Sequence, residues 1–398
     1  MHKIIVMLVA ILSQFLTACS TPQKSPNGFI DKSGAVIVSL DELEKKPLAI
    51  GNFSEGVAPI KTIQGLGFLN KSGEIVFTRP YQSLGPVIGG LAAFEDADRW
   101  GFIDKTGAIK IVPNFLGAHD FSADIAAVKV EKGWTFINKE GKQLFQLTFE
   151  DVGDFKDGFA PVKLNGHWGF IDTTGTFVVP ARFDIAYASG GGKLVAANGT
   201  GLSGDNPDQT VFYFDNLGRL MRKSEFKGIT LNNLRPKMWV RYLTTETPKE
   251  PEKLNRALSR AVSPAYFDDK SIGQADTKFC INEQFAAPAF TGNYDYIFPV
   301  KEGYFVVYDD TTGLFDYRGG KPEAESGIWN SKEFRFYQAA PFSEGLGLVQ
   351  TEKAGPYGFV DKSGKFVLKP IYKYARPFKD GLALVAENEI PPVKENEE

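Results

Sequence analysis

The sequence has 398 residues, 43% of them apolar and 23% charged. A chain of this length and apolar content can bury a large core. Its formal net charge is −3 at pH 7, so the basic surface typical of nucleic-acid-binding proteins is excluded and no nucleic-acid partner is expected. The only cysteines are Cys19 and Cys280, too few for the disulfide framework of a small secreted protein.

The first 18 residues are typical of a signal peptide. Lys3 precedes an apolar run from Ile4 to Leu12, which is too short for an ordinary membrane span. The run ends in Leu16-Thr17-Ala18-Cys19, which resembles the lipobox of bacterial lipoproteins. The resemblance implies that the Cys19 thiol receives a diacylglycerol and that cleavage leaves Cys19 as the first residue. A plain secretory peptide with a chance cysteine is the alternative.

The residue after the cysteine bears on location. The residue after Cys19 is Ser20 and not Asp. By resemblance to bacterial lipoproteins, this implies that the protein is anchored in the outer membrane, on its periplasmic or surface face. Several acyl chains would anchor the protein stably. Residues 19–27 are polar and read as a short tether to the membrane.

A turn motif recurs through most of the remaining chain. An Asp or Asn is followed three residues later by Gly, after aromatic or aliphatic residues, as in GFIDKSG (Gly28 to Gly34). Asp or Asn at the first position and Gly at the fourth favour a type I turn between two strands. Self-similarity of this kind predicts a repeat architecture. The copies are Asp31/Gly34, Asn70/Gly73, Asp104/Gly107, Asn138/Gly141, Asp172/Gly175, Asp215/Gly218, Asp316/Gly319 and Asp361/Gly364.

A second motif precedes the first in several repeats. An aromatic residue leads into a tight turn and then into a strand of small and aliphatic residues, as in FSEGVAPI (Phe53 to Ile60) and FKDGLALV (Phe378 to Val385). A Pro often closes the strand after the first motif, as Pro113 and Pro370 do. Each unit therefore holds about three strands, with room for a short fourth.

The longest gap between copies contains a degenerate ninth unit. Cys280 occupies the position of the repeat Phe, and Asn282 lies 34 residues before Asp316, the spacing of the regular copies. We expect the Cys280 side chain to be buried. Residues from about 219 to 275 are then an insertion, in which Pro251 to Val262 favour a helix.

Together these patterns predict an all-β fold, a repeat array of three-stranded antiparallel meanders over residues 28–387 with one helix-containing insertion. A propeller-like ring and an open curved β-solenoid both remain open. Residues 388–398 are acidic and read as a disordered tail.

Two segments carry a family resemblance. Trp100-Gly101-Phe102-Ile103-Asp104-Lys105 and His167-Trp168-Gly169-Phe170-Ile171-Asp172, preceded by the FSEG-type turns, resemble the WG-repeat (KWG) family of bacterial β-repeats. Departures include Thr135, which replaces the Gly after Trp134. The resemblance implies a non-catalytic repeat platform and names no substrate.

Catalytic and metal-binding motifs are scarce. His119 and His167 lie in different repeats without a Cys partner, so no zinc site is expected, and no cofactor is predicted. The turn Asp residues could line up as a Ca²⁺ ladder. However, each is explained by its own turn, and Asn replaces it in two copies. No enzymatic activity is expected, although a carboxylate pair of a glycan hydrolase stays a minor alternative.

The function predicted from the sequence is a membrane-anchored binding scaffold for a protein or glycan. A structural or envelope-assembly lipoprotein is the alternative. Because the repeats share one geometry, the insertion is the best candidate for a ligand surface, with Trp239 and Tyr242 as possible contacts. The repeated Trp100, Trp134 and Trp168 could stack a ligand but more often such residues fill a core.

Overall fold

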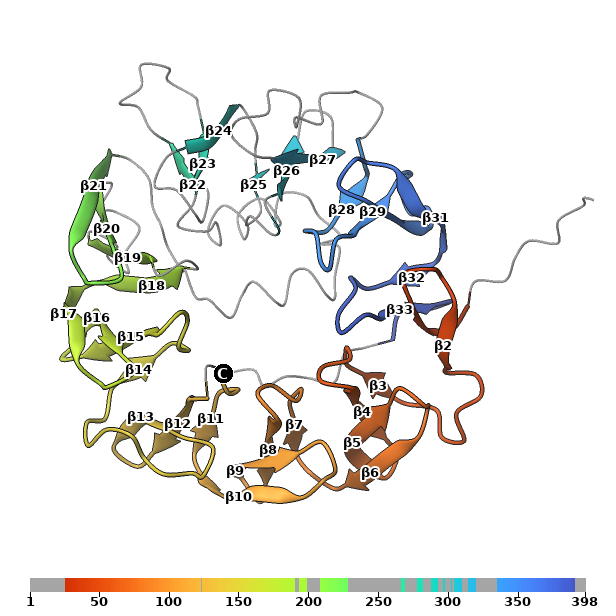
Figure 1. The fold of residues 1–398 in the computed structure, drawn as a ribbon, viewed down its shortest axis with the longest axis horizontal. Coiled ribbons are helices and arrows are strands. Elements are labelled where there is room, and N and C mark those ends of the chain that lie inside the picture. Colours follow the sequence, from red (N-terminus) through yellow and green to blue (C-terminus); the bar gives the residue numbers. More distant parts are fainter. Residues whose placement is uncertain are drawn as a thin grey trace, which may run out of the picture.

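The computed structural model describes residues 26–122, 124–189, 193–198, 208–227, 266–268, 278–281, 288–292, 296–297, 302, 304–309, 314–319 and 335–390. In these ranges the chain forms nine small antiparallel sheets, here called blades 1 to 9. The all-β repeat class and the count of nine units are therefore confirmed. The blades follow one another around a ring (Figure 1). No helix of the described residues could span a membrane.

Six blades have four strands, here called a to d in spatial order from one edge of the sheet. Blade 1 holds β3 (Ala49–Ile50), β4 (Val57–Thr62), β5 (Gly65–Asn70) and β6 (Ile75–Arg79). The others are blade 2 with β7 (Ser83–Leu84), β8 (Leu91–Asp96), β9 (Arg99–Asp104) and β10 (Ile109–Phe115); blade 4 with β14 (Asp151–Val152), β15 (Phe159–Leu164), β16 (His167–Asp172) and β17 (Phe177–Phe183); blade 5 with β18 (Ile185–Ser189), β19 (Lys193–Asn198), β20 (Asp208–Phe214) and β21 (Leu220–Lys227); blade 8 with β28 (Gln338–Ala339), β29 (Gly347–Gln350), β30 (Tyr357–Val360) and β31 (Phe366–Tyr372); and blade 9 with β32 (Tyr374–Ala375), β33 (Ala383–Ala386), β1 (Gly28–Ile30) and β2 (Val36–Ser39).

Three blades show three strands in the described part of the chain. They are blade 3 with β11 (Gly117–Ala118), β12 (Ala126–Val130) and β13 (Gly133–Ile137); blade 6 with β22 (Tyr266–Asp268), β23 (Lys278–Ile281) and β24 (Pro288–Gly292); and blade 7 with β25 (Tyr296–Ile297), β26 (Tyr304–Asp309) and β27 (Leu314–Gly319).

Burial follows the order of the strands within a blade. Strands b and c are almost entirely buried, as in β4 and β5, whereas strand d alternates between exposed and buried residues, as in β10. Strand a has only two residues in most blades and lies toward the middle of the ring, and strand d lies at the rim (Figure 1). This gradient explains why the b and c segments read as continuous apolar runs.

The ring is closed by pairing between the two ends of the array. In blade 9, β1 pairs with β33 through Phe29 and Leu384, so strands from both ends share one sheet (Figure 1). The Arg376 side chain, only 3% exposed, adds to this seam by donating to the carbonyl oxygens of Ile50 in blade 1, at 2.7 Å, and of Ile390. The open solenoid alternative is therefore wrong.

The core lies between blades and depends on the repeated Phe residues. The Phe of strand c in one blade meets the Phe that begins the a–b turn of the next, with ring centroids 4.7 Å apart for Phe29 and Phe53. Edge-to-face contacts of this kind add to the burial of the rings. The same pair recurs as Phe102–Phe121, Phe136–Phe155 and Phe359–Phe378, at 4.8, 5.0 and 4.8 Å.

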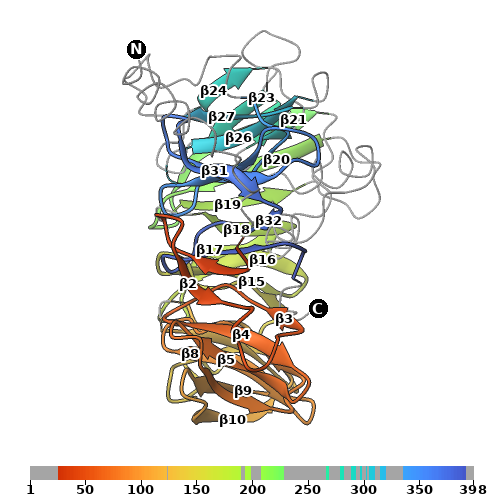
Figure 2. The ribbon, with the colours of Figure 1, turned by 90° about the vertical axis from the view of Figure 1, so that its right-hand side faces the viewer.

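Successive turns of each blade alternate between the two faces of the ring, because the strands form an antiparallel meander. The a–b and c–d turns share one face, here called the turn face. The b–c turns and the d–a connections share the other, here called the connector face. Seen edge-on, the strands run across the thickness of the ring from one face to the other (Figure 2).

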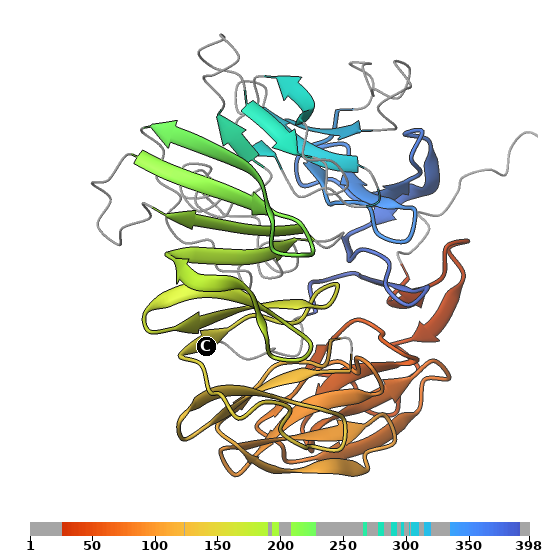
Figure 3. The ribbon, with the colours of Figure 1, turned by 60° about the vertical axis from the view of Figure 1, so that its left-hand side comes forward.

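Several expectations need correction. Asp316 and Gly319 lie inside β27 and form no turn there. Pro113 and Pro370 lie within their d strands, beside Gly101 and Gly358 of strand c, where the pairing shifts register and a missing N–H breaks no ladder bond. Strand β21, one of the long strands of blade 5 (Figure 3), runs to Lys227, and β22 begins at Tyr266. Both strands lie within the expected insertion, so the regular units on either side of it reach to 227 and from 266.

Other expectations for this region are only partly testable. Cys280 lies in the central strand of blade 6, as expected for the ninth unit, opposite Phe290 on β24. The helix expected at 251–262 and the tail beyond 390 lie outside the described residues.

Candidate functional site

The a–b turns supply the most regular polar geometry of the turn face. Ser54 and Val57 exchange backbone hydrogen bonds at 2.8 and 3.2 Å, which leaves Glu55 and Gly56 as the two central residues. Their φ values are 51° and 89°, the positive pair that a type I′ hairpin requires. Gly tolerates this conformation, whereas the acidic residue before it adopts it at some cost. The same geometry holds for Asp157/Gly158, Glu344/Gly345 and Asp380/Gly381.

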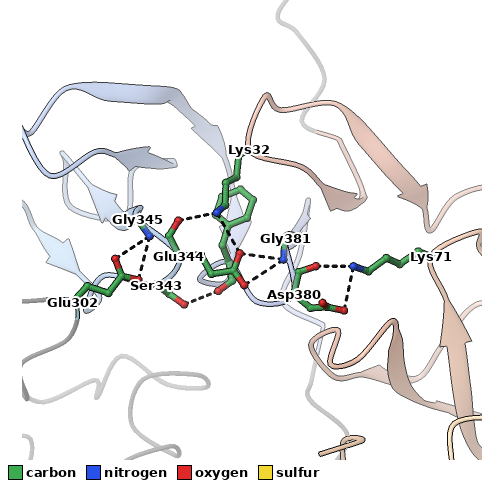
Figure 4. Close-up of polar contacts among 9 residues, drawn as sticks. Lys32, Lys71, Glu302, Ser343, Glu344, Gly345, Asp380 and Gly381 are labelled. Carbon is green, nitrogen blue, oxygen red and sulfur yellow. Dashed lines mark hydrogen bonds and ion pairs between the residues drawn. The ribbon is translucent and has the colours of Figure 1, made fainter. Parts of the chain in front are cut away.

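This strained conformation directs the acidic side chain toward the next blade. The Glu344 carboxylate accepts the backbone N–H of Gly381 at 3.0 Å, and the Asp380 carboxylate accepts that of Gly56 at 2.8 Å. We call this series of contacts the collar, and Figure 4 shows its part around blade 9. Its other contacts run from Gly345 N to Glu302 at 3.0 Å and from Gly89 N and Gly90 N to Glu55 at 2.6 and 2.9 Å.

A lysine of the c–d turn of the second blade completes the contacts made by Glu302, Glu344 and Asp380. Lys32 Nζ lies 2.8 Å from the carbonyl oxygen of Glu344 and 3.4 Å from its carboxylate. Lys71 makes the same pair of contacts with Asp380, at 2.7 and 3.1 Å (Figure 4). A single exposed ion pair contributes little, but here it reinforces a charge-assisted bond to backbone N–H.

The collar changes the ionisation of at least one of its acids. Partial burial of Glu302 acts to raise the pKa of its carboxyl group. The hydrogen bonds from Lys362, whose Nζ is 3.0 Å away, and from the N–H of Gly345 outweigh burial, so this pKa is lowered. The acid therefore stays charged in the contact that joins blades 7 and 8.

The Asp residues of the c–d turns act within their own turns. Asp104 Oδ1 accepts the N–H of Thr106 at 2.8 Å, the hydroxyl of Thr106 at 2.6 Å and the N–H of Ala108 at 3.1 Å. Burial opposes ionisation of Asp104, but these bonds and Lys110 hold its pKa well below the ordinary value. Among the described residues, no group of three or more His, Cys, Asp or Glu could hold a metal ion, so the geometry gives the Ca²⁺ ladder no support.

The collar is interrupted between blades 2 and 3. Gly89 occupies the position that Glu55 has in blade 1, so blade 2 offers no carboxylate there. Lys139, in the c–d turn of blade 3, would be its partner: a Cβ built on Gly89 would lie 3.7 Å from Lys139 Nζ. Lys139 instead binds Asp124 of its own blade at 2.6 Å.

A different contact joins blades 3 and 4 near the middle of the ring. His119 Nδ1 lies 2.6 Å from Asp154 Oδ1 of the next blade, and the imidazole packs against Trp134 at a centroid distance of 4.7 Å. The His119 side chain is 10% exposed, whereas that of Asp154 is 57% exposed. The sequence analysis considered His119 only as a zinc ligand without partner ligands, and it did not predict the pair with Asp154.

The residues predicted as sites fall mostly outside the described chain. Cys19, Trp239 and Tyr242 all lie there, so their roles stay predictions. Trp100 and Trp134 are buried, with 7% and 6% exposure, and Trp168 is half-buried against the core. The core interpretation is therefore confirmed for Trp100 and Trp134, and Trp168 packs at the edge of a core cluster.

Sequence comparison agrees with this repeat geometry. Five segments match the family model described as WG containing repeat: residues 28–62, 100–134, 134–167, 168–196 and 357–389. The chain belongs to the WG-repeat family. These WG segments fall in blades 1 to 5, 8 and 9, and the first of them spans the junction between blades 9 and 1. No curated protein gives a significant match.

Solved structures resemble the WG-repeat ring only distantly. A eukaryotic initiation factor matches at 12% identity and a TM-score of 0.44, covering 82% of this chain and 86% of that one. Virginiamycin B lyase from Staphylococcus aureus matches at 12% and 0.33, covering 82% and 96%. The Pan2 WD40 domain of Neurospora crassa matches at 10% and 0.28, covering 93% and 97%. None of these likenesses carries a functional argument.

The collar was missed in the sequence although a signal for it exists. The acids Glu55, Glu302, Glu344 and Asp380 each precede Gly, and the c–d turn of the next blade carries a Lys after its Asp or Asn, as in Asp31-Lys32 and Asn70-Lys71. Opposite charges that recur one repeat apart could have indicated contacts between neighbouring blades.

Proposed function

We propose that this WG-repeat ring is a non-catalytic binding scaffold of the bacterial cell envelope. Lipid on Cys19 anchors it, in the outer membrane, and the ring presents a surface to a protein or glycan partner. The collar is the observation that carries the proposal. The polar side chains repeated from blade to blade hold neighbouring blades together, which makes the ring a rigid platform.

Rigid repeats leave recognition to the residues that differ between blades. Binding residues concentrate on segments positioned by a rigid scaffold. Two parts of the chain depart from the repeat pattern: the insertion between β21 and β22, with Trp239 and Tyr242, and the sector around His119 and Gly89. We expect the partner to contact the insertion.

The anchor is tested by fractionation and mass spectrometry. Cys19→Ser should move the protein out of the membrane fraction or leave it as an unprocessed precursor, because the thiol is the lipid acceptor. The wild-type N-terminal peptide should carry the mass of a diacylglycerol on Cys19. An unmodified N-terminus at another residue would contradict the anchor.

The partner surface is tested by cross-linking recovery with the lipid-free chain from Ser20. Trp239→Ala with Tyr242→Ala should abolish recovery of a specific protein or glycan and leave thermal unfolding unchanged. The control is Lys105→Ala, an exposed c–d turn residue. Recovery that survives the double substitution would place the partner on the described ring instead.

A further inference from the structure

Both described ends of the array leave the ring on the connector face. Strand β1 begins at Gly28 and β33 ends at Ala386, and these are the ends that a b–c turn joins in the other blades. The described chain therefore enters β1 from the connector face, so an anchor that precedes Pro26 would be joined to the ring on that side. The turn face, with the collar, lies on the opposite side.

A chain of hydrogen bonds links the end of this tether to blade 1. Asn27 Nδ2 donates to Asp41 Oδ1 at 2.7 Å, and the Asn27 carbonyl accepts the N–H of Leu40 at 2.9 Å. Further along the same d–a connection, Lys45 Nζ donates to Gln64 Oε1 at 2.7 Å. Gln64 belongs to the b–c turn of blade 1, so that turn lies beside the point where the tether enters.

This turn carries an apolar tip. Ile63 is 87% exposed, the highest value for any large apolar side chain of the described residues, and Leu48 in the adjoining connection is 54% exposed. The turn itself is held in place, because the buried Thr62 hydroxyl bonds to Gly65 O and accepts Gln64 N–H at 3.3 and 3.1 Å. The equivalent turns of blades 2, 3 and 4 have Ala97-Asp98, Glu131-Lys132 and Asn165-Gly166.

The surroundings of Ile63 are charged but balanced. Lys45, Lys46 and Lys61 are exposed, and so are Glu42 and Glu44. The patch therefore has no strong preference for an anionic surface, and an apolar contact would dominate its binding. An apolar tip with lysines whose alkyl chains can extend beside it fits the boundary between headgroups and acyl chains.

The length of the tether limits where the ring can lie. Nine residue steps separate Cys19 from Gly28, so the tether reaches at most about 30 Å even when fully extended. We infer that Ile63 and Leu48 form a membrane-contacting edge, on which the ring rests with the blade 1 part of its connector face toward the lipid and its turn face away from it. This inference rests on the lipid anchor of the proposed function.

The test supplies the anchor chemically, so it does not depend on lipidation in the cell. The mature chain from Cys19, carrying Cys280→Ala so that only Cys19 reacts, is coupled to a maleimide phospholipid in phosphatidylcholine vesicles that contain a diazirine phospholipid. Cross-linked peptides are mapped by mass spectrometry. We expect them to concentrate on residues 45–66, with the same yield when anionic lipid or salt is added.

Substitutions separate insertion from mere proximity. Ile63→Asp with Leu48→Asp should lower the cross-linking yield on 45–66 by about fivefold, because charged tips leave the acyl region. Ile63→Ser should act in the same direction more weakly. Val112→Asp, a matched control at a rim residue that is 66% exposed, should not change it.

Three outcomes would overturn the inference: cross-links on the a–b turns around 344–345 or 380–381, an even spread over the ring, or a yield that the double substitution leaves unchanged. If the double substitution spares the cross-links but removes recovery of a partner, the tip binds protein and not lipid. An unmodified Cys19 from cells would contradict the proposed function and leave this measurement intact.

Discussion

Blades 7, 8, 9 and 1 and blades 2, 3 and 4 solve the same packing problem differently. Both regions join neighbouring blades through a buried Phe pair, such as Phe29–Phe53 and Phe102–Phe121. The first region adds a carboxylate, a backbone N–H and a lysine at each junction. The second region lacks the carboxylate at Gly89, between blades 2 and 3, and has the His119–Asp154 pair between blades 3 and 4.

The difference follows the continuity of the chain. Blade 9 is assembled from strands at opposite ends of the array, so no turn connects β33 to β1. Closing such a large loop costs conformational entropy, which the contacts across the seam must offset. The collar is regular on both sides of that seam and Arg376 lies at it, whereas the interrupted sector is far from it in sequence. In the part of the ring that the structure describes, the junctions around the seam therefore carry more polar contacts of the collar type than the junction between blades 2 and 3.

Acid should weaken both regions and gives the largest expected effect. The pKa values of Asp31, Asp104, Asp172, Asp215, Asp361 and Glu302 are lowered in the folded ring, in Asp31 chiefly by the Ser33 hydroxyl. A carboxyl group whose pKa is lowered by folding stabilises the folded protein at pH values above its pKa in the unfolded chain, which is 3.8 for Asp. This stabilisation is lost as the pH falls through the pKa of the folded state. Urea unfolding should show a free energy that is level near neutral pH and decreases below about pH 4.

A turn variant provides the control for acid. Asp104→Asn, which copies the residue at Asn70, should reduce the slope of this decrease with little effect at neutral pH. A free energy of unfolding that is independent of pH down to about 3 would contradict the assignment of these carboxylates to native contacts.

Arg376→Met should produce the largest effect of a single substitution. The variant leaves the carbonyl oxygens of Ile50 and Ile390 without their donor, and the free energy of unfolding should decrease by about 2–4 kcal/mol. The matched control is Arg99→Met, whose partner Glu131 is exposed at 78%, with a decrease below about 0.5 kcal/mol. Equal effects in urea unfolding would show that the seam has no special need of polar contacts.

Two carboxylate truncations compare the regions directly. Glu344→Ala removes the acceptor of Gly381 N–H and the partner of Lys32, so the free energy of unfolding should decrease by about 1–2 kcal/mol. Asp124→Ala removes an acid that is 75% exposed and paired with Lys139, with an expected decrease of at most about 0.5 kcal/mol. A larger effect at Asp124, measured by urea unfolding, would reverse the comparison.

The sequence predicted local features of the ring well and long-range ones poorly. Turn chemistry at Asp104 and Gly107, the apolar strands and the nine units depend on contacts within one repeat, which residue patterns record. Closure through Phe29 and Leu384 depends on the summed rotation of all nine blades, which no local pattern specifies. The turn expected at Asp316 failed because pairing with Val307 extends the strand through it.

The candidate site followed the same rule. The buried tryptophans were predicted because burial accompanies the apolar period of each strand. The contacts of Glu344 and of His119 were not predicted, because their partners lie in the neighbouring repeat. The residue type alone does not indicate toward which blade the side chain of a turn residue points. Positive φ at Glu344 determines that direction, and it becomes visible only in the structure.

Gly89→Glu should repair the collar and gives the smallest expected effect. Glu55 shows that a glutamate tolerates this position of the turn, at φ 51°, close to the 63° of Gly89. The new carboxylate would lie within reach of Lys139, and the gain in free energy of unfolding should be about 0.5 kcal/mol, since a surface ion pair contributes little. A double-mutant cycle gives the sharper readout. Asp124→Ala should lower the free energy of unfolding of the wild type but should not lower that of the Gly89→Glu variant, because Lys139 would already have changed partners there. Gly90→Glu, one residue along, is the control and should give neither the gain nor the coupling. Additive effects of Gly89→Glu and Asp124→Ala would mean that Lys139 keeps its own blade's acid, and that the interruption of the collar is not a missing carboxylate.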